Sequence, residues 1–359
     1  MLDSLYPSII LTAGGTGGHV FPALATAEAC LEKGASVTFI TDMRGKKYLV
    51  SQEKITVKTI AVARFGGSVV DRLKAPFLLI KSFLQSVKIL RNAKPVAVVG
   101  FGGYPAFPAA LAAWVLGVPV ILHEQNAVVG RSNRWLLKIA AKIALTYENP
   151  RFLSAFAQTK SIVIGNPVRA IFQQTPYTPP SDSVNLLVLG GSQGASVFSH
   201  VIPDALLLLP KHLQQKIHIT QQARPEDVAI AQQKYAEIGI KATVAAFFDN
   251  VPELLATAQL VIARSGASTC AEIMAVGRPS VLVPYLHAKD DHQTANAIHL
   301  VRQNAAWMLA QADFTAQSLA ELLTLLLEDA DILSRAATNA AQAAPQQAAE
   351  KLAQLAIGS

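Results

Sequence analysis

A turn of small residues after the apolar segment 260–263 is suited to bind an anion through its backbone, and a predicted helix follows it. Gly266 and Ala267 place almost no side chain at this turn, so a ligand can approach the backbone and meet the free N–H groups of the helix start. Glu272 lies three positions after Thr269. Its carboxylate therefore either closes a capping box on Thr269 or binds the two vicinal hydroxyls of a ribose.

A second polar group follows the next predicted strand, residues 280–283. Its carboxylates, imidazole and amides can hydrogen-bond to sugar hydroxyls, because these hydroxyls both donate and accept. The segment 260–297 therefore predicts a pocket for a nucleotide that carries a sugar. The polar residues are Asp290, Asp291, His292, Gln293 and Asn296.

A glycine-rich turn, AGGTGGH at residues 13–19, separates an apolar segment from a predicted helix at residues 20–33. Its backbone N–H groups can turn towards a phosphate. It is not a P-loop, because no Gly-Lys-Ser/Thr follows, and Val20 stands where a dinucleotide fingerprint needs its third glycine. Asp42 ends the second predicted strand, where a dehydrogenase would bind its ribose, so a nicotinamide-dependent dehydrogenase stays an alternative.

Three more polar or glycine-rich segments follow predicted strands: GFGGYP at 100–105, HEQN at 123–126 and GGSQGA at 190–195. Open parallel sheets keep their sites at the carboxyl ends of strands, so these segments are candidate site residues. His19 closes the first glycine turn at a helix start, where the helix dipole favours a neutral imidazole. A neutral imidazole can act as a general base, and Glu124 is the second candidate for that role.

Alternating strand and helix patterns predict two doubly wound α/β domains that face each other across a cleft. Residues 165–169 and the proline-rich run 175–180 suit a linker. We expect domains at 1–165 and 166–340, and a C-terminal helix at 341–359 that packs back on the first domain. The predicted strands are residues 8–12, 36–41, 56–61, 96–100, 118–123, 143–146, 161–164, 185–189, 216–220, 242–246, 260–263 and 280–283.

The composition is that of a folded, globular chain of 359 residues, with 51% hydrophobic and 15% charged residues. No apolar run approaches the length of a membrane span, and the N-terminus lacks a signal-peptide pattern. Cys30 and Cys270 suggest neither a disulfide framework nor a metal site, and we expect a reducing cytoplasm. The net charge of +7 favours a polyanionic partner, either nucleic acid or an anionic membrane.

A predicted helix at residues 75–91 combines a broad apolar face with basic residues. Phe77, Leu79, Ile80, Phe83, Leu84, Val87 and Leu90 share the face that we expect to be buried. Lys74, Lys81 and Lys88 recur every seven residues, and Leu78 and Ile89 project beyond them. One interpretation is an ordinary amphipathic helix; the other is that Leu78, Ile89 and the loop 65–70 enter a membrane while the lysines meet anionic headgroups.

Six segments, in chain order, resemble motifs of the MurG family of bacterial transferases in glycosyltransferase family 28. They are GGTGGHVFP (14–22), GFGGYP (100–105), HEQN (123–126), GNPVR (165–169), GGSQGA (190–195) and RSGAST (264–269) with Glu272. The family moves N-acetylglucosamine (GlcNAc) from UDP-GlcNAc onto undecaprenyl-linked muramyl-pentapeptide, so that lipid I becomes lipid II. The resemblance implies a GT-B fold and an inverting reaction without a metal or other cofactor.

The resemblance also assigns roles to individual residues. In the first domain, the acceptor diphosphate would meet Gly14, Gly15, Thr16, Gly17 and Gly18, with His19, Tyr104, Glu124 and Asn126 around the reacting hydroxyl. In the second domain, the donor would meet Arg169, Ser192, Gln193, Phe247, Phe248, Gly266, Ala267, Ser268, Thr269, Glu272, Gln293 and Asn296. Among these, Glu272 would bind the ribose, and the backbone near Phe247 would bind the uracil.

One position departs from the family pattern, which commonly shows paired glutamines at the sugar end. Here His292 takes the first position, after an acidic run that is one residue longer. The implied partners are an anionic membrane surface and other cell-wall synthesis proteins rather than nucleic acid, and the implied location is the cytoplasmic face of the inner membrane. The alternatives are another GT-B UDP-sugar transferase or epimerase, and a dehydrogenase or nucleotide-binding regulator.

Overall fold

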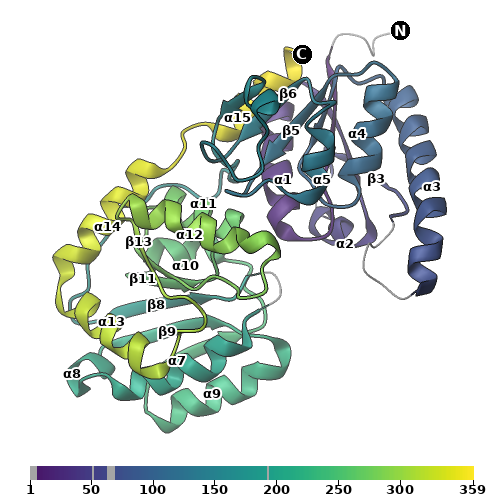
Figure 1. The fold of residues 1–359 in the computed structure, drawn as a ribbon. Helices are drawn as coiled ribbons and strands as arrows, with labels where there is room; N and C mark the ends of the chain where they lie inside the picture. Colours follow the sequence, from purple (N-terminus) through teal and green to yellow (C-terminus); the bar gives the residue numbers. More distant parts are fainter. Residues whose placement is uncertain (1–5, 51, 63–68, 192–193) are drawn as a thin grey trace. The chain divides into compact units, whose positions relative to one another are not determined.

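The computed structural model describes residues 6–50, 52–62, 69–191 and 194–359, without the side chains of residues 69–74. The chain forms two compact units, drawn in Figure 1. Unit 1 contains Met1–Arg169 and Pro345–Ser359, and unit 2 contains Ala170–Ala344. The chain therefore leaves unit 1 four residues beyond the expected boundary at 165, and its last fifteen residues return to that unit.

Unit 1 is built on a parallel sheet with the strand order β3-β2-β1-β4-β5-β6-β7. The order reverses between β1 and β4, so the turns that follow these two strands lie side by side. The strands are β1 (Ser8–Thr12), β2 (Ser36–Thr41), β3 (Thr56–Thr59), β4 (Ala97–Gly100), β5 (Val120–Glu124), β6 (Lys142–Leu145) and β7 (Ser161–Val163). The helical elements are α1 (Gly17–Glu32), α2 (Met43–Lys46), η1 (Lys47–Leu49), α3 (Val69–Ala93), α4 (Ala106–Val115), α5 (Arg131–Leu136), α6 (Ala155–Gln158) and α15 (Ala348–Ile357).

Both faces of this sheet are covered, which explains why its central strands are continuous apolar runs. Alternate residues enter opposite cores: Ile9 and Leu11 of β1 pack with α1 and α15, whereas Ile10 packs on the other face. The C-terminal helix α15 contributes Leu352 and Ala353 to the first of these cores. It packs against α1.

The long helix α3 buries only part of the face that we predicted. Ala75, Ser82, Ser86 and Leu90 are buried, whereas Phe77, Ile80 and Leu84 are 76%, 59% and 59% exposed. Small residues allow α3 to pack closely on α4, and the buried hydroxyls bond to backbone carbonyls one turn earlier.

The structure also corrects the residues that we expected to project from α3 towards a membrane. Leu78 and Ile89 are half-buried, and Ile89 packs against the core. Lys81 and Lys88 are exposed. The side chain of Lys74 and the loop at 65–68 lie outside the described residues. None of the described helices is long and apolar enough to cross a membrane.

Unit 2 contains a parallel sheet with the order β10-β9-β8-β11-β12-β13, which reverses between β8 and β11. Its strands are β8 (Val184–Leu189), β9 (Ile217–Gln222), β10 (Lys241–Ala245), β11 (Leu260–Ala263), β12 (Ser280–Leu282) and β13 (Ala306–Met308). Its helical elements are α7 (Ser196–Leu208), α8 (Lys211–Gln214), η2 (Pro225–Asp227), α9 (Val228–Glu237), α10 (Val251–Thr257), α11 (Ala267–Val276), η3 (Lys289–Asp291), α12 (His292–Arg302), α13 (Ala316–Glu328) and α14 (Ala330–Ala343).

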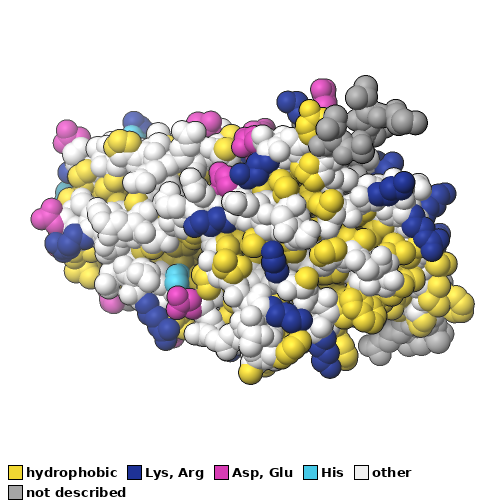
Figure 2. Space-filling model, turned by 90° about the horizontal axis from the view of Figure 1, so that it is seen from above, with side chains coloured by type: hydrophobic (Ala, Val, Ile, Leu, Met, Phe, Trp, Pro, Cys, Tyr) yellow, Lys and Arg dark blue, Asp and Glu magenta, His cyan; other side chains and the backbone are white. Residues whose placement is uncertain are grey.

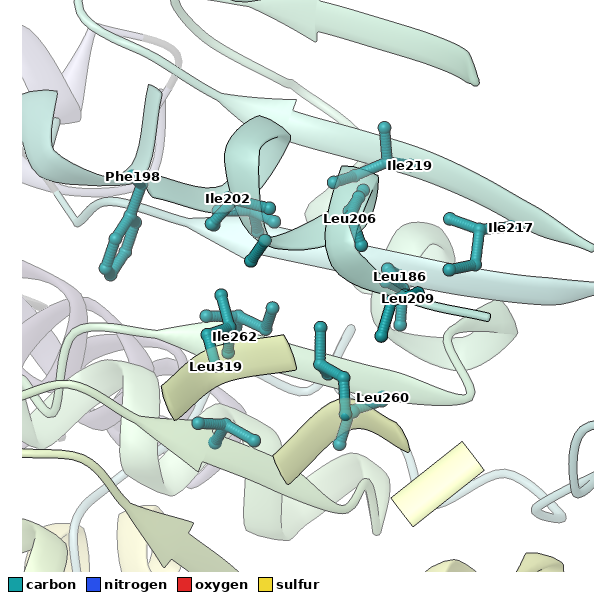
Figure 3. Close-up of a cluster of buried hydrophobic side chains, with 14 of the residues drawn as sticks. Leu186, Phe198, Ile202, Leu206, Leu209, Ile217, Ile219, Leu260, Ile262 and Leu319 are labelled. Carbon is teal, nitrogen blue, oxygen red and sulfur yellow. The ribbon is translucent and has the colours of Figure 1, made fainter. Parts of the chain in front are cut away.

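The core of unit 2 lies between the sheet and helices α7 and α13 (Figure 3). Leu186 and Ile262 of the sheet meet Phe198 and Ile202 of α7 and Leu319 of α13. This packing fixes β8, α7 and β11 relative to one another, and the turns of the candidate donor site extend from these elements.

Candidate functional site

In unit 1, two glycine turns interlock where the strand order reverses. A Cβ atom at Gly103 would lie 2.6 Å from the carbonyl oxygen of Gly14, and one at Gly14 would lie 2.3 Å from Cδ of Pro105. Gly103 also has a φ of 79°, in the left-handed region. These two glycines are therefore required by the packing of the turns, whether or not a ligand binds.

Gly18 differs, because neither packing nor backbone conformation requires a glycine there. It lies in the first turn of α1, and the nearest atom to a Cβ at this position would be Oγ1 of Thr16 at 3.8 Å. A glycine inside a helix costs about 1 kcal/mol relative to alanine. The missing side chain leaves the helix start open to a ligand, as an anion site requires.

His19 follows Gly18 and lies between the two turns. Its Nδ1 is 3.4 Å from Oγ1 of Thr16, the residue that precedes α1. A Cβ atom at Gly102 would be 3.1 Å from Cδ2 and 3.3 Å from Nε2 of His19, so the ring rests against this glycine. When Nδ1 is protonated and donates a hydrogen bond to Oγ1 of Thr16, Nε2 carries a lone pair and can accept a proton.

Glu124, the second candidate base, is 3% exposed at the end of β5 and has both carboxylate oxygens occupied. Oε1 accepts from the backbone and side-chain nitrogens of Asn126, at 3.1 and 3.3 Å. Oε2 accepts from the Gly130 backbone at 2.8 Å and from Asn133 at 2.9 Å. Burial raises the pKa of this carboxyl, and the hydrogen bonds oppose that rise. The arrangement positions the loop between β5 and α5.

Asp42 is also fully engaged, which argues against the dehydrogenase alternative. Its Oδ1 accepts from the backbone of Gly45 at 2.8 Å and of Gly15 at 3.3 Å, and its Oδ2 pairs with Arg44. Burial would raise the pKa of Asp42, but the hydrogen bonds from Gly45 and Arg44 outweigh burial and lower it. A ribose would have to displace these partners, so we assign Asp42 to holding the glycine turn.

Two arginines, Arg44 and Arg169, contact residues of the first glycine turn, GFGGYP or helix α1 in unit 1. The guanidinium of Arg44 lies beside Gly15 and 6.0 Å from the ring centre of half-buried Tyr104. We did not predict Arg44 as a site residue, because it stands outside every glycine motif. Arg169, which we expected near the donor, is the last residue of unit 1, and its guanidinium stacks 4.6 Å from the ring centre of Phe21 in α1.

In unit 2, the turn after β11 begins with a buried arginine. Arg264 donates from Nη1 to the backbone carbonyls of Val283 and Pro284, at 3.0 and 3.2 Å, and stacks 5.0 Å from the ring centre of Phe198. Burial lowers the pKa of Arg264 to about 10, so it remains a cation at neutral pH. A positive charge therefore lies behind this turn.

The helix after this turn starts earlier than the capping-box interpretation requires. Gly266 is the N-cap of α11, which begins at Ala267, so Thr269 lies inside the first turn and cannot be the N-cap. The capping-box interpretation is therefore wrong, and Glu272 lies half-buried one turn further into the helix. Ser268 and Thr269 are also half-buried.

Gly266 repeats the feature found at Gly18. Its φ is −65°, and a Cβ atom would come no closer to another atom than 3.9 Å, from Oγ1 of Thr269. Neither the backbone conformation nor the packing requires glycine there. The absence of a side chain would let a ligand approach the backbone at the start of α11 closely.

Three residues of α12 differ in what they can contact. Asn296 is fully buried and donates to the carbonyl of Ser265 at 3.1 Å, so it supports the turn and, in this structure, does not reach the surface where we expected it to meet a sugar. Oε1 of Gln293 accepts from the Tyr285 backbone at 2.9 Å, which leaves its amide nitrogen for a ligand. Nδ1 of His292 lies 2.9 Å from the Lys289 carbonyl.

The longer acidic run before His292 is accommodated by unusual backbone conformations. Asp290 and Asp291 both have a φ of 53°, in the left-handed region that aspartate tolerates better than most residues. Among the parts of the chain that the structure describes, no three His, Cys, Asp or Glu side chains form a group that could hold a metal ion.

The turn after β8 lies next to β11, and it contains the last expected donor residues. Ser192 and Gln193 lie outside the described residues. Gly194 packs on Arg224, because a Cβ there would be 2.7 Å from Cγ of Arg224. The positive charge of Arg224 contributes to the lowered pKa of Arg264, so two guanidinium groups lie near each other at this end of the sheet. We did not predict Arg224 as a site residue, because it belongs to none of the sequence motifs.

Phe247 is exposed and Phe248 is half-buried in the loop after β10.

Comparison with known proteins places this geometry in a family. The model of the glycosyltransferase family 28 N-terminal domain matches residues 9–145, and that of the C-terminal domain matches residues 185–354. Transferases named UDP-N-acetylglucosamine–N-acetylmuramyl-(pentapeptide) pyrophosphoryl-undecaprenol N-acetylglucosamine transferase are similar over nearly the whole chain. The one from Rhodospirillum centenum is 43% identical over 98% of this chain and 94% of its own length. The one from Brucella abortus is 44% identical over 97% and 93%.

Solved structures show the same relationship. The crystal structure of Acinetobacter baumannii MurG is 31% identical, with a TM-score of 0.79, and covers 98% of this chain and 100% of that one. UDP-GlcNAc 2-epimerase from Neisseria meningitidis, bound to UDP-GlcNAc, has a TM-score of 0.70 over 98% and 100% of the two chains. At 14% identity, that likeness concerns the fold alone. By both family models and by its relatives, the chain is a GT-B enzyme that belongs to glycosyltransferase family 28.

Proposed function

We propose that this protein transfers GlcNAc from UDP-GlcNAc to the C4 hydroxyl of N-acetylmuramic acid in undecaprenyl-pyrophosphoryl-MurNAc-pentapeptide. Relatives that match nearly the whole chain are named as N-acetylglucosamine transferases that use UDP-N-acetylglucosamine and N-acetylmuramyl-(pentapeptide) pyrophosphoryl-undecaprenol. The observation that carries the proposal is the open turn at Gly266, with Glu272 one turn into α11. An open helix start fits a diphosphate, and a carboxylate one turn further on fits a ribose.

In the donor unit, the leaving UDP develops negative charge on its β-phosphate when the bond to C1 of GlcNAc breaks. The backbone at the start of α11, the positive end of its dipole, and the positive charge of Arg264 behind the turn stabilise that charge. Glu272 binds the ribose hydroxyls, and the amide nitrogen of Gln293 is available to the sugar.

In the acceptor unit, His19 is the general base. The C4 hydroxyl attacks C1, Nε2 of His19 accepts the hydroxyl proton, and UDP leaves from the opposite face, which inverts the anomeric centre. Glu124 is less suited to this step, because four hydrogen bonds occupy its oxygens. It holds the loop that carries Asn126 instead.

Binding of nucleotides tests the donor half of this proposal. The full chain should bind UDP-GlcNAc more tightly than UDP-glucose, GDP-mannose or NADH in calorimetric titrations. Glu272→Gln should weaken UDP binding by about 1.5 to 3 kcal/mol, because a neutral amide loses charge-assisted hydrogen bonds to the ribose. Glu253→Gln, which changes an exposed carboxylate in the same unit, is the matched control. Tighter binding of NADH would contradict the proposal.

We also propose that the protein binds peripherally to the cytoplasmic face of the inner membrane, through α3 and the end of α4. Phe77, Ile80 and Leu84 recur at helical spacing and are exposed, and Lys81 and Lys88 flank them. Trp114 and Val115 are exposed at the end of α4, which packs on α3. Figure 2 shows hydrophobic and basic side chains mixed on one face. Such a surface can insert apolar groups while lysines meet anionic headgroups.

Cosedimentation with vesicles of phosphatidylglycerol and phosphatidylethanolamine tests the membrane proposal. Binding should fall when Phe77, Ile80 and Leu84 are all changed to serine, and should become less sensitive to salt in Lys81→Glu/Lys88→Glu. Leu325→Ser, at an exposed leucine of unit 2, is the control. Equal binding by the wild type and both multiple variants would remove α3 from the membrane surface.

A further inference from the structure

Arg44 is a cation beside the glycine turn of unit 1 that the proposed reaction has not yet used. Its side chain is 41% exposed, whereas that of its partner Asp42 is 4% exposed. The partly exposed guanidinium is therefore held in place by its ion pair with a buried carboxylate. An anchored arginine loses less conformational freedom when it binds an anion than an unrestrained surface arginine does.

The hydrogen bonds fix which part of the guanidinium faces a ligand. Nε and Nη2 of Arg44 both donate to Oδ2 of Asp42, at 3.1 and 2.9 Å. An arginine has five N–H donors, so the two on Nη1 and one on Nη2 are not used by this pair. The guanidinium can therefore bind phosphate oxygens while it remains paired with Asp42.

The same carboxylate also ties Arg44 to the glycine turn. Oδ1 of Asp42 accepts the backbone N–H of Gly15 at 3.3 Å, and a Cβ atom at Gly15 would lie 3.2 Å from Nη2 of Arg44. Gly15 has a φ of 85°, so a side chain there would be strained as well as crowded. The turn and the guanidinium thus form one surface.

We infer that Arg44 binds the diphosphate of the lipid acceptor, held in position by Asp42. This inference rests on the proposed function and adds a specificity residue to it. Arginine suits phosphate oxygens because its N–H groups are planar and permanently charged. The second phosphate of a diphosphate adds negative charge, so Arg44 should favour diphosphate-linked over monophosphate-linked acceptors.

Steady-state kinetics of the full chain test this with two short-chain polyprenyl acceptors, one linked to MurNAc-pentapeptide by a diphosphate and one by a monophosphate. Arg44→Gln should lower kcat/KM for the diphosphate acceptor about 10- to 100-fold, the usual range for a hydrogen bond to a charged group. The effect on the monophosphate acceptor should be smaller, and KM for UDP-GlcNAc should stay within about twofold. Arg44→Lys should recover part of the loss, because it restores the charge without the fork.

Lys33→Gln is the control, since it removes an exposed positive charge at the far end of α1. An equal loss on both acceptors, or no loss on either, would overturn the assignment of Arg44. Direct binding of the short-chain polyprenyl diphosphate, measured by calorimetry, separates this inference from the proposed function. Equal affinity in the wild type and Arg44→Gln would refute the role of Arg44 even if no GlcNAc were transferred, whereas failure of transfer alone would refute only the proposed reaction.

Discussion

The side-chain nitrogen of Asn133 donates a hydrogen bond to Oε2 of Glu124 at 2.9 Å. This bond helps to occupy the carboxylate of Glu124, so the two candidate bases, His19 and Glu124, have different surroundings. Glu124 is buried and fully hydrogen-bonded, whereas His19 is half-buried at the helix start. The two residues should therefore respond differently to substitution.

His19→Ala should reduce kcat about 10² to 10⁴ fold, with the affinity for UDP-GlcNAc and the melting temperature nearly unchanged. Glu124→Gln should lower the free energy of unfolding by about 1 to 3 kcal/mol, because an NH₂ group replaces one acceptor oxygen. Initial rates, donor titrations and thermal melts of both variants measure these effects. Full activity in His19→Ala, with a large loss of kcat and no loss of stability in Glu124→Gln, would move the base to Glu124.

Substitutions at Gly18 should weaken acceptor binding without lowering the stability of the protein. Gly18→Ala should keep or raise stability by up to about 1 kcal/mol, because alanine favours a helix and a Cβ would make only an ordinary contact, 3.8 Å from Oγ1 of Thr16. The acceptor KM should rise, and should rise further in Gly18→Leu, because a larger side chain blocks the helix start. Gly103→Ala is the contrasting variant and should lower the melting temperature, since its Cβ would meet Gly14. An unchanged acceptor KM in Gly18→Leu would place the diphosphate elsewhere.

Arg278 holds the segment that enters unit 2 from Ala170. Its buried guanidinium donates to the backbone carbonyls of Leu255 and Thr175, at 2.9 and 3.1 Å, and to Oγ1 of Thr175 at 2.5 Å. Arg278→Ala should lower the free energy of unfolding by about 3 kcal/mol or more, because it leaves several carbonyls buried without partners. Chemical denaturation measures the loss, and Arg335→Ala, at an exposed position, should change little. A small loss in Arg278→Ala would mean that water replaces the guanidinium.

His123 should make the stability of unit 1 fall in acid. Its Nε2 lies 3.0 Å from the carbonyl of Gly165, its Nδ1 has no partner among the described residues, and burial lowers its pKa to about 4. The unfolded chain, with a pKa of about 6.5, binds a proton that the folded chain refuses until about pH 4. The stabilisation is therefore complete above pH 6.5 and is lost as the pH falls towards 4, by about 3 kcal/mol at 1.4 kcal/mol per pKa unit.

Urea unfolding between pH 4 and 7 measures this dependence. A Trp307→Phe background leaves Trp114 and Trp135, both in unit 1, as the fluorescent reporters. His123→Asn should show a shallower loss of stability in acid than the histidine parent. Parallel pH profiles would contradict the assignment.

The elements that the sequence predicts best are those whose signal is local. Strands β1, β2 and β11 begin and end where we predicted, because buried parallel strands are continuous apolar runs bounded by turns. The glycine turns were equally visible. Strand β13, Ala306–Met308, was not predicted, because three residues at a sheet edge carry too short a pattern.

The remaining errors concern relationships between distant segments. Helical spacing groups Phe77, Ile80 and Leu84 on one face of α3, but it cannot tell which face α4 will cover. Arg44 and Arg224 belong to no motif, and only the parallel arrangement of neighbouring strands brings them to the glycine turns. Asn296 has a suitable side chain for a sugar, yet its burial beneath Ser265 follows from how α11 and α12 pack.

Transfer of radiolabelled GlcNAc tests the central claim most directly. Wild type, incubated with UDP-[¹⁴C]GlcNAc and the polyprenyl diphosphate-linked MurNAc-pentapeptide in the presence of EDTA, should yield a lipid-linked disaccharide and an equal amount of UDP. The transfer should be lost in His19→Ala and reduced in Glu272→Gln at subsaturating donor. Release of UDP together with free N-acetylmannosamine, or tight binding of UDP-GlcNAc with no label in the lipid, would contradict the account and favour an epimerase or a binding protein.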